Sequence, residues 1–392
     1  MMRGLLSLLL LLCSTAAMSQ LDFTRYDDYP VTFAEQELVN AWAGGMNSVQ
    51  VSRVDLDLDG NLDLFVFDRL GNRVLTFLNE NPSPGVAFYV HTTEYLDALP
   101  ELRNWVLFRD FNCDGAMDIF TSAPGSMKVY RNLNQDELAF ELEVELLYAE
   151  YNLSGSPFDA PVYCASVDVP SIIDYDGDGD LDIFTFTELA STVYYYKNES
   201  VEESDVCGLD FRTANRCYGQ FSEASENATL FYGDDFECDF NVINPEGIVS
   251  PEENRHSLHT GGCVCQIDLD EDGVLDFMLS DVTEIFMTEL MMQEDVNGFD
   301  EVYLTENDFP ADWQSTPAIA LRTFPCSYYE DINNDGVRDL VVSPNATIDT
   351  EDDDSMWLYI NNGADDNPDF ELIQEDFLQS TMIDLGRGAH PI

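Results

Sequence analysis

Basic residues are scarce in this chain. Its 392 residues include 16 Lys and Arg against 76 Asp and Glu, so the formal net charge at pH 7 is −60. A surface this acidic repels nucleic-acid phosphates and anionic lipid headgroups, which argues against both as partners. Cations are the partners that such a surface favours.

Recognisable catalytic motifs are also lacking. The chain has four histidines and contains no HExxH, no GxSxG and no phosphate-binding glycine-rich loop. These absences remove the usual sequence support for a metalloprotease, a serine hydrolase or a nucleotide-binding enzyme. We therefore expect no enzyme and name no catalytic residue. A glycosidase-type pair of carboxylates stays open, because sequence does not test the distance between two carboxyl groups.

Long apolar runs are missing after the first twenty residues. The run from Leu5 to Leu12 is too short to span a bilayer, follows Arg3, and precedes the small-x-small sequence Ala17-Met18-Ser19. Residues 1–19 are therefore expected to be a signal peptide, and residues 20–392 the secreted or cell-surface protein. Hydrophobic residues make up 45% of the chain, which is enough for a large folded core.

Cysteine pairing is expected in an exported chain. Removing the signal peptide leaves eight of the nine cysteines, and none shows the paired CxxC spacing of a zinc site. Two disulfides are favoured by proximity in the sequence, and cysteines in or beside predicted strands are expected to be buried thiols. The expected bridges are Cys207–Cys217 and Cys238 with either Cys263 or Cys265; the expected thiols are Cys113, Cys164 and Cys326.

One nine-residue pattern, D-x-[DN]-x-D-G-x-x-D, occurs five times. Repetition at this level indicates a repeat architecture. The residues at positions 1, 3, 5, 7 and 9 are Asp55, Asp57, Asp59, Asn61 and Asp63; Asp110, Asn112, Asp114, Ala116 and Asp118; Asp174, Asp176, Asp178, Asp180 and Asp182; Asp268, Asp270, Asp272, Val274 and Asp276; and Asp331, Asn333, Asp335, Val337 and Asp339.

The spacing within this pattern suits a calcium loop. Side-chain oxygens at positions 1, 3 and 5 converge when the backbone curls around a hard cation, and Gly at position 6 permits the sharp turn. Position 7 offers its backbone carbonyl, and the Asp at position 9 closes the shell. The plain alternative is an acidic turn in an acidic protein, which five identical spacings make a poor explanation. The sequence therefore predicts about five Ca²⁺ ions.

The flanking residues predict strands. An EF-hand needs a carboxylate at position 12 and a following helix, whereas position 12 here is Val66, Thr121, Thr185, Leu279 or Val342. Runs such as Leu64-Phe65-Val66 favour β structure on leaving the loop, and Val51–Val54 does so on entering it. Four later aromatic or aliphatic runs end at an asparagine: Asn79, Asn132, Asn198 and Asn361.

The repeat length predicts the fold class. Successive patterns begin 55, 64, 94 and 63 residues apart, and about four strands fit in such a unit, as in a propeller blade. We expect an all-β propeller with five calcium-loop blades and six or seven blades in the intact ring. The 94-residue interval contains a cysteine-rich insertion at about 201–261. The chain ends where a sixth loop is due, so either it is truncated or its last strand closes the ring beside the N-terminal segment.

These five loops resemble those of the FG-GAP/VCBS-type repeat family, found in integrin α-subunit propellers and in secreted bacterial proteins. The segment Ala41–Asn47 also resembles the entry to the first blade of exported bacterial relatives. The resemblance implies calcium in the first hairpin of each blade on one face, and partner binding on the opposite face. It implies an extracellular binding or adhesion module for a protein or glycan. The alternatives are a polysaccharide lyase or hydrolase on the same scaffold, or a structural part of a larger surface protein.

Overall fold

The computed structural model describes most of the chain. The described residues are 26, 29–81, 83–85, 88–133, 136–153, 156–188, 191–223, 229–236, 238, 261–282, 284–294, 300–311, 315–351 and 353–384. The expected signal peptide at 1–19 lies outside them, as does most of the second half of the expected insertion. No helix within the described ranges is long and apolar enough to cross a membrane.

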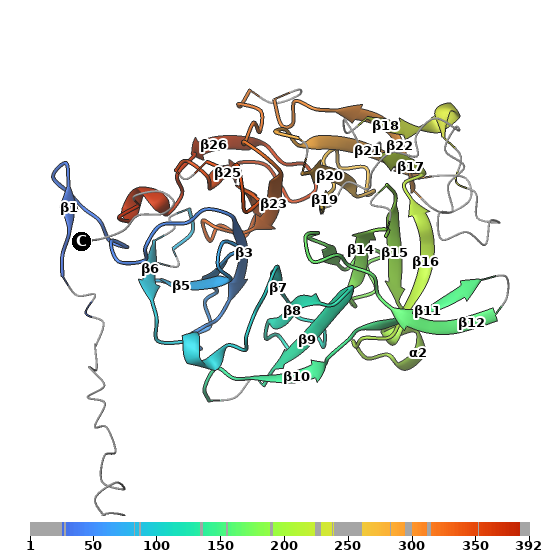
Figure 1. Cartoon of the computed structure of the whole chain (residues 1–392), viewed down its shortest axis with the longest axis horizontal. Helices are drawn as coiled ribbons and strands as arrows, with labels where there is room; N and C mark the ends of the chain where they lie inside the picture. Colours follow the sequence, from blue (N-terminus) through green and yellow to red (C-terminus); the bar gives the residue numbers. More distant parts are fainter. Residues whose placement is uncertain are drawn as a thin grey trace, which may run out of the picture.

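Among the described residues five sheets form a ring, and each contains four antiparallel strands that are neighbours in sequence order (Figure 1). Blade 1 consists of β3 (Val49–Val54), β4 (Asp63–Asp68), β5 (Arg73–Asn79) and β6 (Tyr89–Thr92); blade 2 of β7 (Val106–Arg109), β8 (Asp118–Ala123), β9 (Ser126–Asn132) and β10 (Phe140–Val144); blade 3 of β13 (Ser171–Ile173), β14 (Asp182–Phe186), β15 (Val193–Asn198) and β16 (Phe211–Tyr218); blade 4 of β19 (Gly262–Ile267), β20 (Asp276–Asp281), β21 (Thr288–Glu294) and β22 (Asp300–Glu306); and blade 5 of β23 (Pro325–Glu330), β24 (Asp339–Pro344), β25 (Trp357–Asn361) and β26 (Phe370–Gln374). The expected β-propeller is confirmed.

Blade 3 carries extra elements. The hairpin of β11 (Tyr148–Leu153) and β12 (Ser156–Pro161) extends its sheet, because β11 pairs in parallel with β16. A short helix, α2 (Ser200–Ser204), lies between β15 and β16. The first part of the expected insertion therefore supplies α2 and the fourth strand of this blade.

The ring closes between blade 5 and blade 1. The inner strand β23 lies against β3, and Val49 N donates a hydrogen bond of 3.1 Å to Ser343 Oγ. After β26 the chain returns to the N-terminal segment, where Ile383 N donates to Ala41 O at 3.2 Å. The ring formed by the described residues thus has five blades, fewer than the six or seven expected. The Ile383–Ala41 contact agrees with the expectation that the last part of the propeller lies beside the N-terminal segment.

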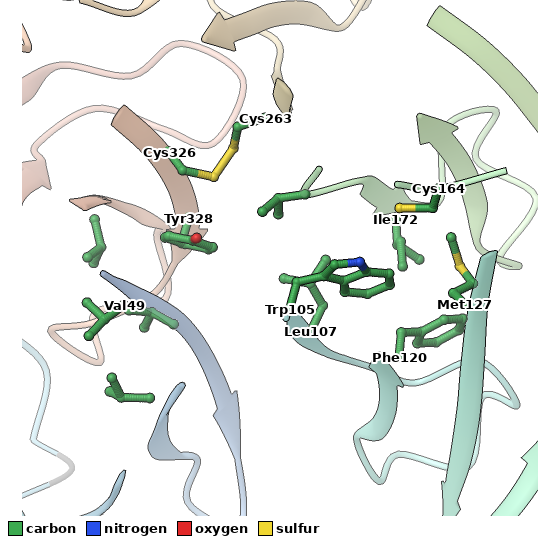
Figure 2. Packing of buried hydrophobic residues seen from close by; sticks show 14 of the residues in the cluster. Val49, Trp105, Leu107, Phe120, Met127, Cys164, Ile172, Cys263, Cys326 and Tyr328 are labelled. Carbon is green, nitrogen blue, oxygen red and sulfur yellow. A yellow bond between two sulfur atoms is a disulfide. The ribbon is translucent and has the colours of Figure 1, made fainter. Parts of the chain in front are cut away.

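Buried second strands explain the propeller packing. Every described residue of β4, β8, β14, β20 and β24 is buried, as their apolar runs predict. Alternate side chains pack against the two neighbouring blades: Phe65 of blade 1 meets Phe108 of blade 2 at a ring-centroid distance of 4.6 Å. Figure 2 shows the inner ends of the blades, with Trp105 and Phe120 packed beside Ile172.

Three disulfides join the described residues: Cys113–Cys207, Cys217–Cys238 and Cys263–Cys326. Cys164 is a free buried thiol, as expected, and Cys265 is also free.

Both expected bridges are therefore wrong, and so are the expected free thiols at Cys113 and Cys326, which form disulfides. The Cys207–Cys217 bridge fails because β16 rises by about 3.3 Å per residue and carries Cys217 away from Cys207. Cys263 bonds Cys326 because their strands, β19 and β23, are inner neighbours in the ring (Figure 2). Three disulfides are typical of proteins from an oxidising compartment.

Candidate metal centres

The five acidic patterns form the hairpins between the first and second strands of the five blades. We name them loop 1 (55–63), loop 2 (110–118), loop 3 (174–182), loop 4 (268–276) and loop 5 (331–339). All inner strands of a propeller run in the same direction, so these hairpins share one face of the ring. Direct contacts agree with this: Asn79 Nδ2, beside loop 1, donates to Asn334 Oδ1 of loop 5 at 2.9 Å.

The backbone curls in the same way in each loop. Position 4 has a left-handed conformation in all five, with φ between 58° and 76°, and four of these residues are not glycine. The glycine at position 6 also has positive φ, from 84° to 104°. Such angles strain an L-residue, and glycine at position 6 avoids this strain. The position-4 residues are Leu58, Cys113, Gly177, Glu271 and Asn334.

Carboxylates at positions 1 and 5 accept hydrogen bonds from the curled backbone. The position-5 carboxylate accepts from the position-7 N–H in every loop, at 2.8–3.0 Å. The position-1 carboxylate accepts from the position-6 glycine N–H at 2.8–3.1 Å in loops 1, 2, 4 and 5. In loop 3, Asp174 Oδ1 accepts from Gly177 N at 2.9 Å instead. These bonds hold acidic oxygens in place within short loops.

The position-9 aspartate has a second structural role. Its Oδ1 accepts from a backbone N–H of the third strand at 2.7–2.9 Å in all five blades. In loops 1, 2, 4 and 5 its Oδ2 accepts from the N–H of position 2. Each side chain is at most 3% exposed. The sequence prediction gave this residue only a metal-binding role.

The asparagine that ends the third strand completes this link. In blades 1, 2, 3 and 5 its Nδ2 donates to the backbone oxygen of position 8 at 3.1–3.2 Å. Met292 supplies the corresponding N–H in blade 4 and has no such side-chain donor. The sequence signal was available, since four of the apolar runs end at asparagine. Its structural role depends on a contact with a residue 15 to 23 positions earlier in the chain.

Three loops bring carboxylates close together. One ligand oxygen from each of Asp55, Asp57 and Asp63 lies within 4.8 Å of the other two, and the same holds for Asp268, Asp270 and Asp276. In loop 3 the corresponding group is Asp174, Asp176 and Asp178. Hard oxygen donors at this spacing fit Ca²⁺, which accepts six to eight oxygens in flexible geometry.

Loops 2 and 5 have asparagine at position 3 and therefore fewer carboxylates. The close acidic groups found among the described residues come from loops 1, 3 and 4. In loop 5, however, Asp331 Oδ1 is buried with no hydrogen-bond partner among the described atoms. Such an oxygen is available to a cation.

Burial raises the pKa of all five position-9 aspartates, and neighbouring carboxylates raise it further, while backbone N–H donors lower it. Burial and neighbouring negative charge disfavour the ionised form of these carboxyl groups. A bound cation would favour the ionised form. The pKa is about 6 for Asp63, about 7 for Asp118, about 8 for Asp182, about 7 for Asp276 and about 6 for Asp339.

The position-7 residues differ from one another. Four of them have no carboxylate, so their backbone carbonyl is the group that could bind a cation, as the sequence predicts: Asn61, Ala116, Val274 and Val337. Asp180 does have one, and its side chain is 1% exposed. Loop 3 therefore departs from the common pattern in both its turn and its acidic content.

Comparison with known proteins supports the repeat assignment. Residues 110–185, which contain loops 2 and 3, match the family model described as FG-GAP-like repeat. The resemblance seen in the sequence is thus confirmed. No curated protein matches the chain in sequence.

Among solved structures, one similar chain comes from work described as the structural basis of specific recognition of non-reducing terminal N-acetylglucosamine by an Agrocybe aegerita lectin. It is 15% identical, the match covers 86% of this chain and 68% of that one, and the TM-score is 0.33. At this TM-score the likeness carries no argument about a ligand.

Proposed function

From a five-bladed propeller with FG-GAP-like repeats, we propose that this chain is a secreted or cell-surface calcium-binding module that binds an extracellular protein or glycan. The observation that carries the proposal is the same acidic hairpin five times on one face. Three of these hairpins bring three carboxylates within 4.8 Å of one another. Three disulfides support an oxidising, extracellular location.

In this proposal calcium has a structural role. When bound, the ion supplies positive charge that offsets carboxylate repulsion in each loop. In loop 1, Asp55 and Asp57 hold the ion, and Asp63 links the loop to the third strand through Asn79 N. Five such links would stiffen one face of the ring and leave the other face to contact a ligand.

A retention assay tests the binding role. The mature chain is immobilised and presented with a panel of extracellular polysaccharides and matrix proteins, in calcium and in chelator. We expect calcium-dependent retention of at least one member of the panel with no change in its size. Glycan that is shortened instead would contradict a binding module and favour the carbohydrate-active enzyme. An absence of retention would contradict the proposed ligand classes.

A further inference from the structure

Loop 3 has a second acidic group beside the one that matches the other loops. One ligand oxygen from each of Asp178, Asp180 and Glu202 lies within 4.8 Å of the other two. Asp178 also belongs to the first group, with Asp174 and Asp176. Glu202 comes from α2, outside the repeated pattern. The two groups thus share Asp178, and their other members differ.

Two buried oxygens of this second group have no partner among the described residues. They are Asp180 Oδ1 and Asp178 Oδ2. The other oxygen of Asp180 accepts from Val201 N at 2.9 Å, and the side chain is 1% exposed. A carboxylate oxygen that is buried without a donor is unfavourable unless a cation meets it. Position 7 is acidic in loop 3 and in no other loop.

The excess of negative charge around loop 3 also favours a bound cation. Loop 3 and α2 bring together five aspartates and Glu202, against the single ammonium group of Lys197. Lys197 Nζ contacts Asp176 and lies 2.5 Å from Glu202 Oε1. One carboxylate oxygen of Asp178 and one of Glu202 lie within 4.8 Å of each other. Two acidic groups this close are repulsive when both are ionised, and a divalent ion between them removes that repulsion.

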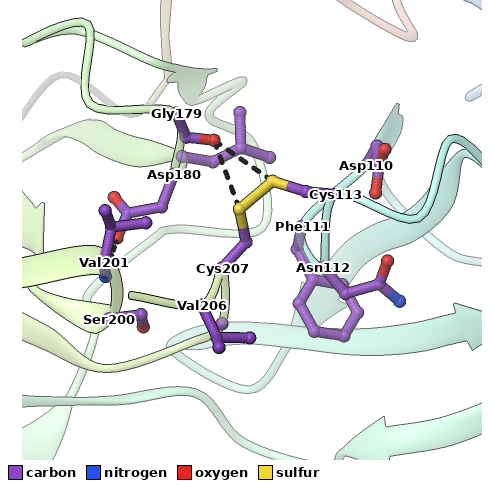
Figure 3. Close-up of a disulfide and its surroundings, with 12 residues drawn as sticks. Asp110, Phe111, Asn112, Cys113, Gly179, Asp180, Ser200, Val201, Val206 and Cys207 are labelled. Carbon is purple, nitrogen blue, oxygen red and sulfur yellow. Dashed lines mark hydrogen bonds between the residues drawn. A yellow bond between two sulfur atoms is a disulfide. The ribbon is translucent and has the colours of Figure 1, made fainter. Parts of the chain in front are cut away.

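The segment that carries Glu202 is held against the loop. The Cys113–Cys207 disulfide joins it to loop 2, and the two sulfurs lie 3.3 and 3.6 Å from Gly179 O (Figure 3). On its other side, Val201 N bonds Asp180, as the same view shows. The glutamate is thus positioned by covalent and hydrogen-bonded contacts on both sides.

We propose that blade 3 binds two divalent cations of the calcium type, the second held by Asp178, Asp180 and Glu202, with Asp178 shared between the two ions. This inference rests on the proposed calcium-binding function and adds a sixth ion to the five loop sites. Because Glu202 lies in α2, the second ion would fasten the α2 segment to the calcium face.

Calcium stoichiometry tests the inference. Bound calcium is counted by equilibrium dialysis of the mature chain against CaCl₂, at a concentration that just saturates the wild type. The variants are Glu202→Gln, Asp174→Asn and the two combined. Glu203→Gln is the matched control, because it removes the same charge from the adjacent exposed residue. We expect one ion fewer in each single variant, two fewer in the combination, and no loss in the control.

The outcomes separate the two proposals. If Glu202→Gln binds as many ions as the wild type, the second site is wrong while the loop sites stand. If the combined variant loses only one ion, Glu202 belongs to a single loop 3 site, which also overturns the two-ion arrangement. A wild-type chain that binds no calcium overturns the proposed function as well. Glu202 is exposed, so its substitution leaves the fold intact.

Discussion

A single buried aspartate joins each acidic loop to the third strand of its blade. Asp118 shows the arrangement: its two oxygens accept from Phe111 N and Asn132 N, and it is fully buried. These bonds form within the protein itself and need no cation. The position-9 aspartates therefore stabilise the fold in two ways, by this link and by contributing charge to the loop.

We predict that Asp118→Ala lowers the free energy of unfolding by about 2–4 kcal/mol, because two buried N–H groups lose their acceptor. The loss persists in chelator. Urea unfolding in calcium and in chelator measures it. Asp114→Ala in the same loop is the control, since Asp114 is exposed and its loss should matter mainly in calcium. An Asp118→Ala chain as stable as the wild type in chelator would contradict the link.

Asp168 provides a pH-dependent prediction away from the loops. It is 3% exposed, and its carboxylate accepts from Gly262 N at 3.0 Å and Ala165 N at 3.3 Å. Burial raises its pKa to about 6, and the two N–H groups and Arg69 lower it only in part. The folded state therefore binds this proton more tightly than the unfolded state does. Stability from this group is present below about pH 4 and is lost as pH rises to about 6.

We expect Asp168→Asn to remove that dependence. Relative to the wild type, the variant should gain up to about 3 kcal/mol in free energy of unfolding between pH 4 and pH 7. Denaturant unfolding of both chains across this range, at fixed calcium, gives the difference. A difference that does not change with pH would show that Asp168 does not titrate as described.

At the level of elements, the loops and strands could be predicted from the sequence, and the disulfides could not. The acidic pattern and the apolar runs after it identify loop and strand from neighbouring residues, and the structure agrees at all five sites. The disulfides join residues 94, 21 and 63 positions apart. Proximity along the chain favoured Cys207–Cys217, because nothing local reveals that Cys217 lies in β16, which carries it away from Cys207, or that loop 2 lies beside α2.

We predict that replacing both Cys113 and Cys207 by serine lowers the free energy of unfolding by about 2–4 kcal/mol, since the bond closes a long loop. The second ion of blade 3 should also bind more weakly, because α2 is no longer held to loop 2. Unfolding and calcium titration measure the two effects. Cys265→Ser serves as the control, because it removes a thiol and breaks no bond. Unchanged stability and affinity in the double variant would contradict the role of the disulfide.

At the scale of the whole molecule, arginines cross between blades. Arg69 Nη1 donates to Asn345 O of the blade 5 turn at 2.6 Å, and its Nη2 donates to Ser166 O before blade 3 at 3.3 Å. Arg109 of blade 2 bonds Ile172 O of blade 3 and Glu330 of blade 5. Ring closure thus depends on contacts hundreds of residues apart. For this reason the sequence predicted the blades and not their number.

We expect Arg69→Ala to lower the free energy of unfolding by about 2–3 kcal/mol, because charged hydrogen bonds that link three parts of the ring are lost. Arg103→Ala is the control. Arg103 pairs with Glu101 at the surface, where such an ion pair contributes about 0–1 kcal/mol. Thermal and urea unfolding compare the two. Equal effects would show that Arg69 does not join the blades energetically.

The central claim is that the acidic loops are structural calcium sites. Calorimetric titration of the mature chain with calcium, together with melting temperatures in calcium and in chelator, tests it most directly. We predict five loop sites plus the second site of blade 3. We also predict a large rise in melting temperature, since each site at one hundred times its Kd adds about 2.7 kcal/mol to the free energy of unfolding. No binding, or equal melting temperatures in calcium and in chelator, would contradict the claim.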